Sequence, residues 1–198
     1  MPGRPAVFID RDGCLTEEVG YVNHPSRLRL LPRSVEAVGR LNRAGIPVVV
    51  ATNQAGIAKG YFSEATLQDV NAEMVRQLAL GDAHLDGLYV CVHHPREGEP
   101  PYRLRCGCRK PLPGLLVTAS RDMGLDLDAS VMVGDKLSDV AAGQAAGAAG
   151  VLVLSGYGRG EWEYRAASTE IRPDHVADDL LDAVIWALTR AADSPVRR

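Results

Sequence analysis

Apolar residues follow two different patterns along the chain, short continuous runs and a helical period, and these patterns predict alternating strands and helices. Short apolar runs rich in β-branched residues, of which 46–51 is the clearest, predict strands buried on both faces. Elsewhere apolar residues recur every three or four positions, as Val35, Val38 and Leu41 do, which predicts amphipathic helices. The expected strands are 6–9, 46–51, 87–92, 130–133, 151–154 and 175–176, and the expected helices are 34–42, 63–80, 113–123, 138–146 and 177–191.

Two of the expected helices carry local end signals. Ser63 is a candidate N-cap, because its hydroxyl can accept a hydrogen bond from a backbone N–H of the first turn. Thr66 stands where a complete capping box would have Glu. Gly124 is a candidate helix stop, because glycine readily adopts the left-handed conformation that ends many helices. The last residues, 194–198, are expected to fray.

Strands that alternate with helices predict a three-layer, doubly wound, Rossmann-like α/β fold. In such a fold, helices cover both faces of one parallel sheet. A length of 198 residues suits one domain over 1–198 and is short for two independent domains. Sheets of this kind bind ligands beyond the carboxyl ends of their strands. The residues that follow the strands are therefore the first candidates for a functional site.

Charge and hydropathy narrow the classes of function. The net charge is −3 and the sequence pI is about 5.9, which argues against nucleic-acid binding through a broad basic surface. No targeting signal precedes the first strand, and the longest apolar run, 145–154, is too short to span a membrane. We therefore expect a cytoplasmic protein with a small-molecule partner. Its small size and polar surface favour a monomer.

Two carboxylates follow the first expected strand. Asp10 and Asp12 are two residues apart, and Gly13 permits a backbone turn next to them. If their surroundings separate their pKa values, one can ionise and attack while the other holds a proton for the leaving group. Taken alone, the pair fits a solvated turn with two acidic residues better than it fits an active site.

Polar side chains also follow other expected segments. Thr52 offers a hydroxyl, Lys110 can neutralise a phosphoryl group, and Asp135 stands at a strand end where a Mg²⁺ ligand would be needed. Asp139 could support Asp135 or anchor Lys136. Each signal alone fits a polar loop, a solvated basic patch or an acidic helix N-terminus. Together they predict one site, because the ends of parallel strands can converge.

The ordered set of motifs resembles the haloacid dehalogenase superfamily over about 6–155. The motifs are Asp10-Arg-Asp-Gly13, Thr52-Asn53, Lys110 and Gly134-Asp135 with Asp139. The resemblance implies that Asp10 is the nucleophile, that Asp12 is general acid and then base, and that Thr52 and Lys110 stabilise the phosphoryl group. It also implies catalytic Mg²⁺, held by Asp10, the backbone carbonyl of Asp12 and Asp135. The cation and Lys110 would offset the repulsion between a carboxylate and a phosphate ester.

A histidine and three cysteines flank a polar, proline-rich stretch, which we call the cysteine loop (91–108). Cys91 and His93 are two residues apart and share one face of an extended backbone, and Cys106 and Cys108 can do the same. Three cysteines and one histidine are a complete tetrahedral set for structural Zn²⁺. The loop is therefore predicted to be a zinc-binding insertion, with three buried thiols and a surface histidine as the alternative.

The cysteine loop and the motif set together look like one branch of that superfamily, the D-glycero-D-manno-heptose-1,7-bisphosphate 7-phosphatases. The similarity covers nearly the whole chain and includes 20–22, 52–60, 91–95 and 106–111. It implies a phosphatase without a large cap domain, acting on a small sugar bisphosphate in the biosynthesis of ADP- or GDP-heptose precursors. Arg109 is expected to meet the second phosphate. The residues implied near the substrate are Glu18, Val19, Gly20, Tyr21, Asn53, Gln54, Ala55, Arg109 and Lys136.

Three alternatives stay open. A histidinol-phosphate phosphatase would share the cysteine loop and the chemistry, although 20–22 and 55–60 favour the heptose branch. A nucleic-acid end phosphatase is disfavoured by the acidic pI and by the lack of an aromatic and basic groove. A zinc-stabilised binding module without activity would not need the complete charged set of Asp10, Asp12, Lys110 and Asp135.

Overall fold

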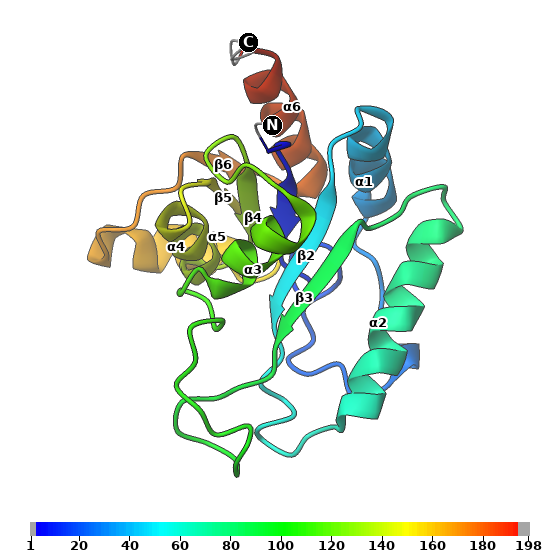
Figure 1. Cartoon of the computed structure of the whole chain (residues 1–198), viewed down its shortest axis with the longest axis vertical. Coiled ribbons are helices and arrows are strands. Elements are labelled where there is room, and N and C mark those ends of the chain that lie inside the picture. The colour runs from blue at the N-terminus through cyan, green and yellow to red at the C-terminus, as the bar shows by residue number, and fades with distance from the viewer. Residues whose placement is uncertain (1–2, 194–198) are drawn as a thin grey trace.

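The computed structural model describes residues 3–193, and its centre is one six-stranded parallel sheet (Figure 1). The strands are β1 (Val7–Ile9), β2 (Val48–Asn53), β3 (Gly87–Cys91), β4 (Val131–Gly134), β5 (Ala149–Val153) and β6 (His175–Ala177). They lie in the order β3-β2-β1-β4-β5-β6, and all neighbouring pairs are parallel. The chain therefore reverses its direction of travel across the sheet between β1 and β4, the position where doubly wound folds bind ligands.

Helices connect the strands and cover both faces of the sheet (Figure 1). The main helices are α1 (Ser34–Arg43), α2 (Glu64–Ala79), α3 (Gly114–Met123), α4 (Leu137–Ala145) and α6 (Leu180–Asp193). One hydrophobic cluster holds α1, α2 and α6 against one face, whereas α3 and α4 pack on the other. The predicted three-layer α/β architecture is therefore confirmed.

The alternation of side chains along β1 shows how the sheet is buried on both faces. Val7 and Ile9 belong to the cluster with α1, α2 and α6, and Phe8 belongs to the cluster with α3. All three side chains are at most 2% exposed. An apolar residue is needed at every position of such a strand, which explains why β1 reads as a continuous apolar run.

The predicted strands and helices are confirmed in type and order, with shifts at several ends. β2 begins later than predicted, at Val48, and continues through Thr52 and Asn53, which pair with β3. The last helix begins at Leu180 and not at 177, because Ala177 still pairs with Val153 of β5. The short helical turns η1 (Pro25–Arg27), α5 (Gly158–Gly160), η2 (Glu161–Arg165) and η3 (Ala166–Ser168) were not predicted.

Both helix-end signals are confirmed. The Ser63 hydroxyl accepts a hydrogen bond from the Thr66 N–H at 3.1 Å, so it caps α2. Gly124 has a φ of 66° and ends α3 in the left-handed conformation. These ends were predictable because each depends on residues within one turn of the helix.

The extent of the domain and the nature of the last residues stay predictions. All six strands join one sheet, but the assignment of the whole of 1–198 to one domain is not tested by this observation. The expected fraying of 194–198 lies outside the described residues. Among residues 3–193, the structure has no helix with both the length and the apolar character to cross a membrane.

Candidate active site

A cavity of about 510 Å³ opens at the carboxyl ends of the central strands. Asp10 directly follows β1, Thr52 and Asn53 end β2, and Asp135 directly follows β4. Asp135 is fully buried next to the cavity. The predicted residues that line the cavity are Asp10, Asp12, Glu18, Gly20, Tyr21, Thr52, Asn53, Gln54, Ala55, Arg109, Lys110 and Lys136.

The side chain of Lys110 is the centre of a buried ion cluster. Its Nζ lies 2.9 Å from Asp10 Oδ1 and 2.7 Å from Asp139 Oδ1, and it donates a hydrogen bond to the Ala51 carbonyl at 2.8 Å. All three charged side chains are buried. Because an ammonium has three donors and each has a partner here, the position of the positive charge is fixed next to Asp10.

The ion cluster shifts the pKa values of Asp10 and Lys110 in the sense that keeps both charged, whereas burial raises the pKa of Asp139. Burial alone would raise the pKa of Asp10, but the Lys110 ammonium lowers it below its ordinary value. Burial would likewise lower the pKa of Lys110, but Asp10 and Asp139 raise it. At neutral pH, Asp10 is therefore an ionised carboxylate held beside a fixed cation.

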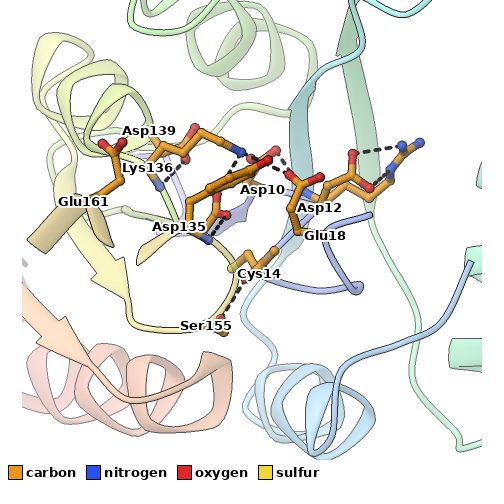
Figure 2. Close-up of polar contacts among 12 residues, drawn as sticks. Asp10, Asp12, Cys14, Glu18, Asp135, Lys136, Asp139, Ser155 and Glu161 are labelled. Carbon is orange, nitrogen blue, oxygen red and sulfur yellow. Dashed lines mark hydrogen bonds and ion pairs between the residues drawn. The ribbon is translucent and has the colours of Figure 1, made fainter. Parts of the chain in front are cut away.

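Asp135 is a buried carboxyl group whose surroundings favour the binding of a further cation. Burial raises its pKa to about 7, a rise that Lys136 opposes and Asp10 reinforces. Asp10, Asp135 and Asp139 each offer an oxygen, and these oxygens lie within 4.8 Å of one another (Figure 2). Buried carboxylate oxygens at this density are the donor set of a hard divalent cation such as Mg²⁺. The residues present therefore fit the predicted metal.

Asp139 anchors the side chain of Lys110, whereas it reaches Lys136 only through the backbone. Its Oδ2 accepts a hydrogen bond from the Lys136 N–H at 3.0 Å. The Lys136 ammonium instead lies 3.3 Å from Glu18 Oε2 and 3.3 Å from Asp135 Oδ1. Lys136 therefore ties the loop that follows β1 to the end of β4.

Asp12 is held apart from the ion cluster by Arg11. Nε and Nη2 of Arg11 donate to the two carboxylate oxygens of Asp12 at 3.0 and 2.9 Å. Further hydrogen bonds join Arg11 to Gln54 Oε1 at 2.8 Å and to Asn71 Oδ1 at 3.0 Å, and Arg11 is 0% exposed. Gln54 Nε2 also donates to Asp12 Oδ2 at 2.7 Å. The Asp12 carboxylate is thus directed away from that of Asp10 (Figure 2).

Two glycines allow the backbone to approach Asp135 closely. Gly13 and Gly156 have φ values of 81° and 55°, and a Cβ on either would overlap the Asp135 carboxylate. The Ser155 hydroxyl donates to the Gly13 carbonyl at 2.7 Å and joins the two turns (Figure 2). A larger side chain at Gly13 would therefore displace the carboxyl group that the metal site needs.

The loop after β1 brings only some of its predicted residues to the cavity. Glu18 and Tyr21 line it, and the Gly20 N–H donates to Glu18 Oε1 at 2.6 Å, which shapes the turn. The Tyr21 ring lies 4.6 Å from the Tyr61 ring, centroid to centroid. Val19 is 37% exposed and is not among the residues that line this cavity.

The cysteine loop gathers Cys91, His93, Cys106 and Cys108 into one cluster. Their ligand atoms lie within 4.8 Å of one another. Cys108 Sγ lies 3.2 Å from the sulfurs of Cys91 and Cys106 and 3.5 Å from His93 Nδ1. With a Zn–S bond of about 2.3 Å, sulfurs at two corners of a tetrahedron are ~3.8 Å apart. The four side chains therefore fit a closed tetrahedral metal site.

The end of the cysteine loop is attached to the end of β2. Arg109 Nη1 donates to the His93 carbonyl at 3.1 Å. The Asn53 side chain donates to the Lys110 carbonyl at 3.1 Å and accepts from the Lys110 N–H at 3.2 Å. This paired contact fixes the backbone from which the Lys110 side chain enters the ion cluster.

Arg11, Asp139 and Tyr157 bear on the site but were not predicted as site residues. The position of Arg11 between two acidic residues was the available signal for it. The sequence suggests Asp139 as a support for Asp135 or an anchor for Lys136, but its partner Lys110 is 29 positions away and no local pattern joins them. Tyr157 donates its N–H to Asp135 Oδ2 at 2.9 Å, a contact that no sequence pattern indicates.

Comparisons with known proteins agree with this geometry. A family model described as HAD-hydrolase-like matches residues 107–183. The D-glycero-beta-D-manno-heptose-1,7-bisphosphate 7-phosphatase of Salmonella typhi is 39% identical over 191 residues, which are 96% of this chain and 93% of that protein. The D-glycero-D-manno-heptose-1,7-bisphosphate 7-phosphatase of Thermosynechococcus vestitus is 42% identical over 198 residues, covering 97% and 99%.

A solved structure has the same fold over nearly its whole length. It is the D,D-heptose 1.7-bisphosphate phosphatase from B. bronchiseptica complexed with magnesium and phosphate. Its TM-score is 0.83 at 35% sequence identity, and the match covers 94% of this chain and 99% of that one. A protein from Mesorhizobium loti described as a "putative had-like phosphatase" is also 35% identical, with a TM-score of 0.81, and the match covers 100% of this chain and 91% of that one.

Proposed function

We propose that this chain removes the 7-phosphate of D-glycero-D-manno-heptose 1,7-bisphosphate. The premise is that the chain belongs to the family of D-glycero-D-manno-heptose-1,7-bisphosphate 7-phosphatases among the HAD-like hydrolases. The proposed mechanism rests on the ion cluster of Lys110 with Asp10 and Asp139. An ionised Asp10, with Lys110 Nζ at 2.9 Å, faces a cavity of about 510 Å³. A carboxylate prepared in this way suits attack on phosphorus better than any other group that lines the cavity.

Asp10 is the nucleophile of this proposal. Its Oδ1 accepts hydrogen bonds from Lys110 and from the Arg11 N–H at 2.8 Å. Oδ2 is therefore the oxygen that attacks phosphorus, and the bond from phosphorus to the sugar oxygen breaks. Lys110 and the Thr52 hydroxyl stabilise the charge on the transferred phosphoryl group. The product of this step is an aspartyl phosphate on Asp10.

Asp12 moves the protons in both steps. In its protonated form, released from Arg11, it gives a proton to the departing sugar oxygen. In its ionised form, which Arg11 orients through two hydrogen bonds, it takes a proton from the water that attacks the aspartyl phosphate. Inorganic phosphate then leaves, and Asp10 is regenerated.

Two metals complete the proposal. Asp10, the backbone carbonyl of Asp12 and Asp135 would hold Mg²⁺, and the raised pKa of Asp135 supports a cation there. When bound, Mg²⁺ supplies positive charge that offsets the repulsion between the phosphate ester and the carboxylate. The magnesium in the B. bronchiseptica relative supports the same choice. A structural Zn²⁺ would be held by Cys91, His93, Cys106 and Cys108.

The substrate side of the proposal rests on the groups around the cavity mouth. Arg109 and Lys136 present positive charge to a bisphosphate, and Glu18 and Tyr21 face its sugar. The backbone of 53–55 contributes polar groups beside them. Val19 contributes only through its place in the loop that carries Glu18.

Turnover of a generic aryl phosphate tests the mechanism. We expect phosphate release to require Mg²⁺ and to fall by at least about 10³-fold in Asp10→Asn, since the nucleophile is lost. Asp69→Asn, the same substitution at an exposed position of α2, is the matched control and should behave as wild type. Equal turnover by the purified Asp10→Asn and wild-type proteins would refute the mechanism.

Competing substrates test the specificity. The heptose 1,7-bisphosphate should exceed histidinol phosphate in kcat/KM by at least about tenfold, equivalent to ~1.4 kcal/mol. Arg109→Ala should lose much of this preference, because its guanidinium would bind the second phosphate. If histidinol phosphate is the better substrate of the wild type, the heptose assignment is wrong and the aspartyl-phosphate mechanism still stands.

The cellular setting belongs to the same proposal. A cytoplasmic location is supported by the four free cysteines, since a reducing compartment keeps thiols available for metal binding. We propose that the chain acts as a monomer in heptose precursor biosynthesis, without a nucleic-acid or membrane partner. Size-exclusion chromatography with light scattering would test the monomer directly.

A further inference from the structure

The aromatic ring of Tyr157 lies over the Lys136 ammonium at the wall of the active-site cavity. Lys136 Nζ is 4.6 Å from the centroid of this ring. Both residues line the cavity, although Lys136 precedes α4 and Tyr157 follows β5. An ammonium within about 6 Å of a tyrosine ring is attracted by the negative charge of the ring face. The chemistry proposed above uses Lys136 and gives the Tyr157 ring no part.

Two carboxylates also contact the Lys136 ammonium. Nζ lies 3.3 Å from Glu18 Oε2 and 3.3 Å from Asp135 Oδ1. Both distances are longer than those of strong charge-assisted hydrogen bonds, so the carboxylates attract the ammonium without fixing its position closely. The Lys136 side chain is 35% exposed, which leaves part of it open to a ligand in the cavity. The ammonium therefore lies among groups from the loops after β1, β4 and β5.

A tight turn after β5 fixes the backbone from which the Tyr157 ring projects. The Tyr157 N–H donates to Asp135 Oδ2 at 2.9 Å. The next residue, Gly158, donates its N–H to the Ser155 carbonyl at 2.8 Å, and a Cβ on it would overlap the Val153 carbonyl. On such a backbone a tyrosine has only two side-chain torsions to settle, so presenting its ring costs little conformational entropy.

Lys136 gains from a fixed neighbour because a lysine side chain is long and flexible. A substrate that must order this side chain on binding loses affinity, since the entropy of ordering opposes association. A ring face covers one side of the ammonium and attracts it, and the exposed part of the side chain stays available to a ligand. A lysine held in this way is ordered before the substrate arrives.

We propose that Tyr157 is a positioning residue, whose ring holds the Lys136 ammonium in place for the substrate. This inference rests on the proposed function, because Lys136 is taken to meet a phosphate of the bisphosphate. The contact is made by the ring face, so a phenylalanine can replace the tyrosine. Loss of the ring should act on KM and not on kcat, because Asp10 and Lys110 keep their contacts.

Two substitutions of Tyr157 separate the ring from the rest of the residue, since both keep the N–H that donates to Asp135. At saturating Mg²⁺, Tyr157→Leu should raise KM for the heptose 1,7-bisphosphate about fivefold, the worth of a partly exposed ammonium–ring contact. Its kcat should stay within about twofold of wild type, and Tyr157→Phe should have the wild-type KM. Tyr164→Leu is the matched control, because Tyr164 belongs to the adjoining η2, is 80% exposed and does not line the cavity. A wild-type KM in Tyr157→Leu, or an equal rise in Tyr157→Phe, would overturn the proposal.

A double-mutant cycle shows whether the ring acts through the lysine. In a Lys136→Met background, Tyr157→Leu should change KM by less than about 1.5-fold, because no ammonium remains to be positioned. A similar rise in both backgrounds would show that the ring contacts the substrate directly, and would refute the positioning role.

An NMR signal of Lys136 tests the contact without any substrate. The ring current of Tyr157 should shift the ε-methylene protons of Lys136 upfield in wild type and in Tyr157→Phe. In Tyr157→Leu, these protons should return toward the shift of an exposed lysine. An unchanged Lys136 signal in Tyr157→Leu would refute the inference whatever the substrate is. A wild type that prefers histidinol phosphate would refute the proposed substrate, and the NMR comparison would still decide on the ring.

Discussion

Single residues in this site matter most where the fold buries a cation among acids. Lys110 lies between Asp10 and Asp139, and Arg11 lies against Asp12. Both cations are buried, so the carboxylates beside them depend on them for compensating positive charge. Removing one member of a buried ion pair leaves the other desolvated and uncompensated, which costs more than the pair itself contributes. Substitutions of the two cations are therefore expected to affect stability as well as activity.

Lys110→Met should destabilise the metal-free protein by about 3–5 kcal/mol, because two buried carboxylates lose their counter-charge. The same change should lower kcat for an aryl phosphate by at least about 100-fold, since a fixed cation at the phosphoryl group is lost. Urea unfolding and steady-state kinetics measure the two effects. Lys59→Met removes a partly exposed ion pair with Glu97 and should cost less than ~1 kcal/mol. Similar costs for the two variants would contradict the buried cluster.

Arg11→Met should slow the second chemical step more than the first. An aryl oxide is a good leaving group and needs little help from an acid, whereas hydrolysis of the aspartyl phosphate needs Asp12 as a base. Without the two donors of Arg11, the Asp12 carboxylate loses the contacts that fix its position. Stopped-flow measurements should show a burst of about one aryl alcohol per enzyme, followed by slow turnover.

Asp12→Asn is the reference for that experiment, and it should give the same burst. A folded Arg11→Met protein with slow turnover and no burst would show that Arg11 acts in the first step or only on substrate binding. Circular dichroism and zinc content identify variants that have lost the fold.

The sequence predicted the residues that follow strands but not the residues that hold them. Asp10, Thr52 and Asp135 could be placed because each comes at the end of a recognisable apolar run. The partners of Arg11 could not be placed, since Gln54 and Asn71 are 43 and 60 positions away. Such pairings depend on tertiary packing, which for Asn71 is the packing of α2 against the sheet, and the local pattern does not contain it.

Among the elements, the cysteine loop has the most direct connection to the chemistry. It begins at the end of β3 and leads directly into Arg109 and Lys110, and its three cysteines and His93 form a cluster at its base. Its tip packs on the loop after β2, where a Cβ on Gly98 would overlap the Ala58 carbonyl. With few apolar residues of its own, the loop is expected to need the proposed Zn²⁺ to order the backbone that carries Lys110.

Loss of zinc should therefore lower activity although no catalytic residue changes. Cys108→Ser should bind much less than one zinc per chain and lose at least about tenfold in kcat/KM, because Lys110 loses its fixed position. Cys14→Ala is the control, since Cys14 is buried away from the metal cluster and should leave about one zinc per chain. Elemental analysis and aryl-phosphate kinetics on the same samples measure both. Full activity in a zinc-free protein would contradict this coupling.

The helical turns over 158–168 could not be predicted from hydrophobic periodicity. They begin in a glycine-rich stretch and have large exposed rings at Trp162 and Tyr164, so no amphipathic period identifies them. A tertiary contact holds them in place: the Glu161 carboxylate accepts the Leu137 N–H at 3.1 Å and also pairs with Arg165. A carboxylate at the N-terminus of α4 complements its dipole.

For the molecule as a whole, the decisive feature is the adjacency of β1 and β4. The sequence predicted a doubly wound sheet but not the order of its strands. In the structure Ile9 pairs with Val133, and the Asp10 N–H donates to the Val133 carbonyl at 2.9 Å. This pairing brings Asp10 and Asp135 together from positions 125 residues apart in the chain. The acidic groups that meet there repel each other, so the stability of the whole fold should depend on a cation.

Magnesium should stabilise the folded chain as well as support catalysis. At a concentration of 100 times Kd, a ligand of the folded state contributes about 2.7 kcal/mol, or ~5–10 °C in Tm for a chain of this size. The raised pKa of Asp135 gives the accompanying pH dependence. Between the unfolded pKa near 3.8 and the folded pKa of about 7, the folded state keeps a proton that the unfolded state releases, so stability from this group falls as pH rises.

Asp135→Asn separates these two effects by thermal unfolding at pH 8 with the zinc site filled. Without Mg²⁺, the variant should melt at a higher temperature than wild type, because a buried carboxylate that repels Asp10 has become neutral. With Mg²⁺, the order should reverse, since the variant lacks a charged ligand and gains little from the cation. A variant that is less stable in both conditions would show that Asp135 contributes mainly through its hydrogen bond with Tyr157, and an equal Mg²⁺ shift in both proteins would place the cation elsewhere.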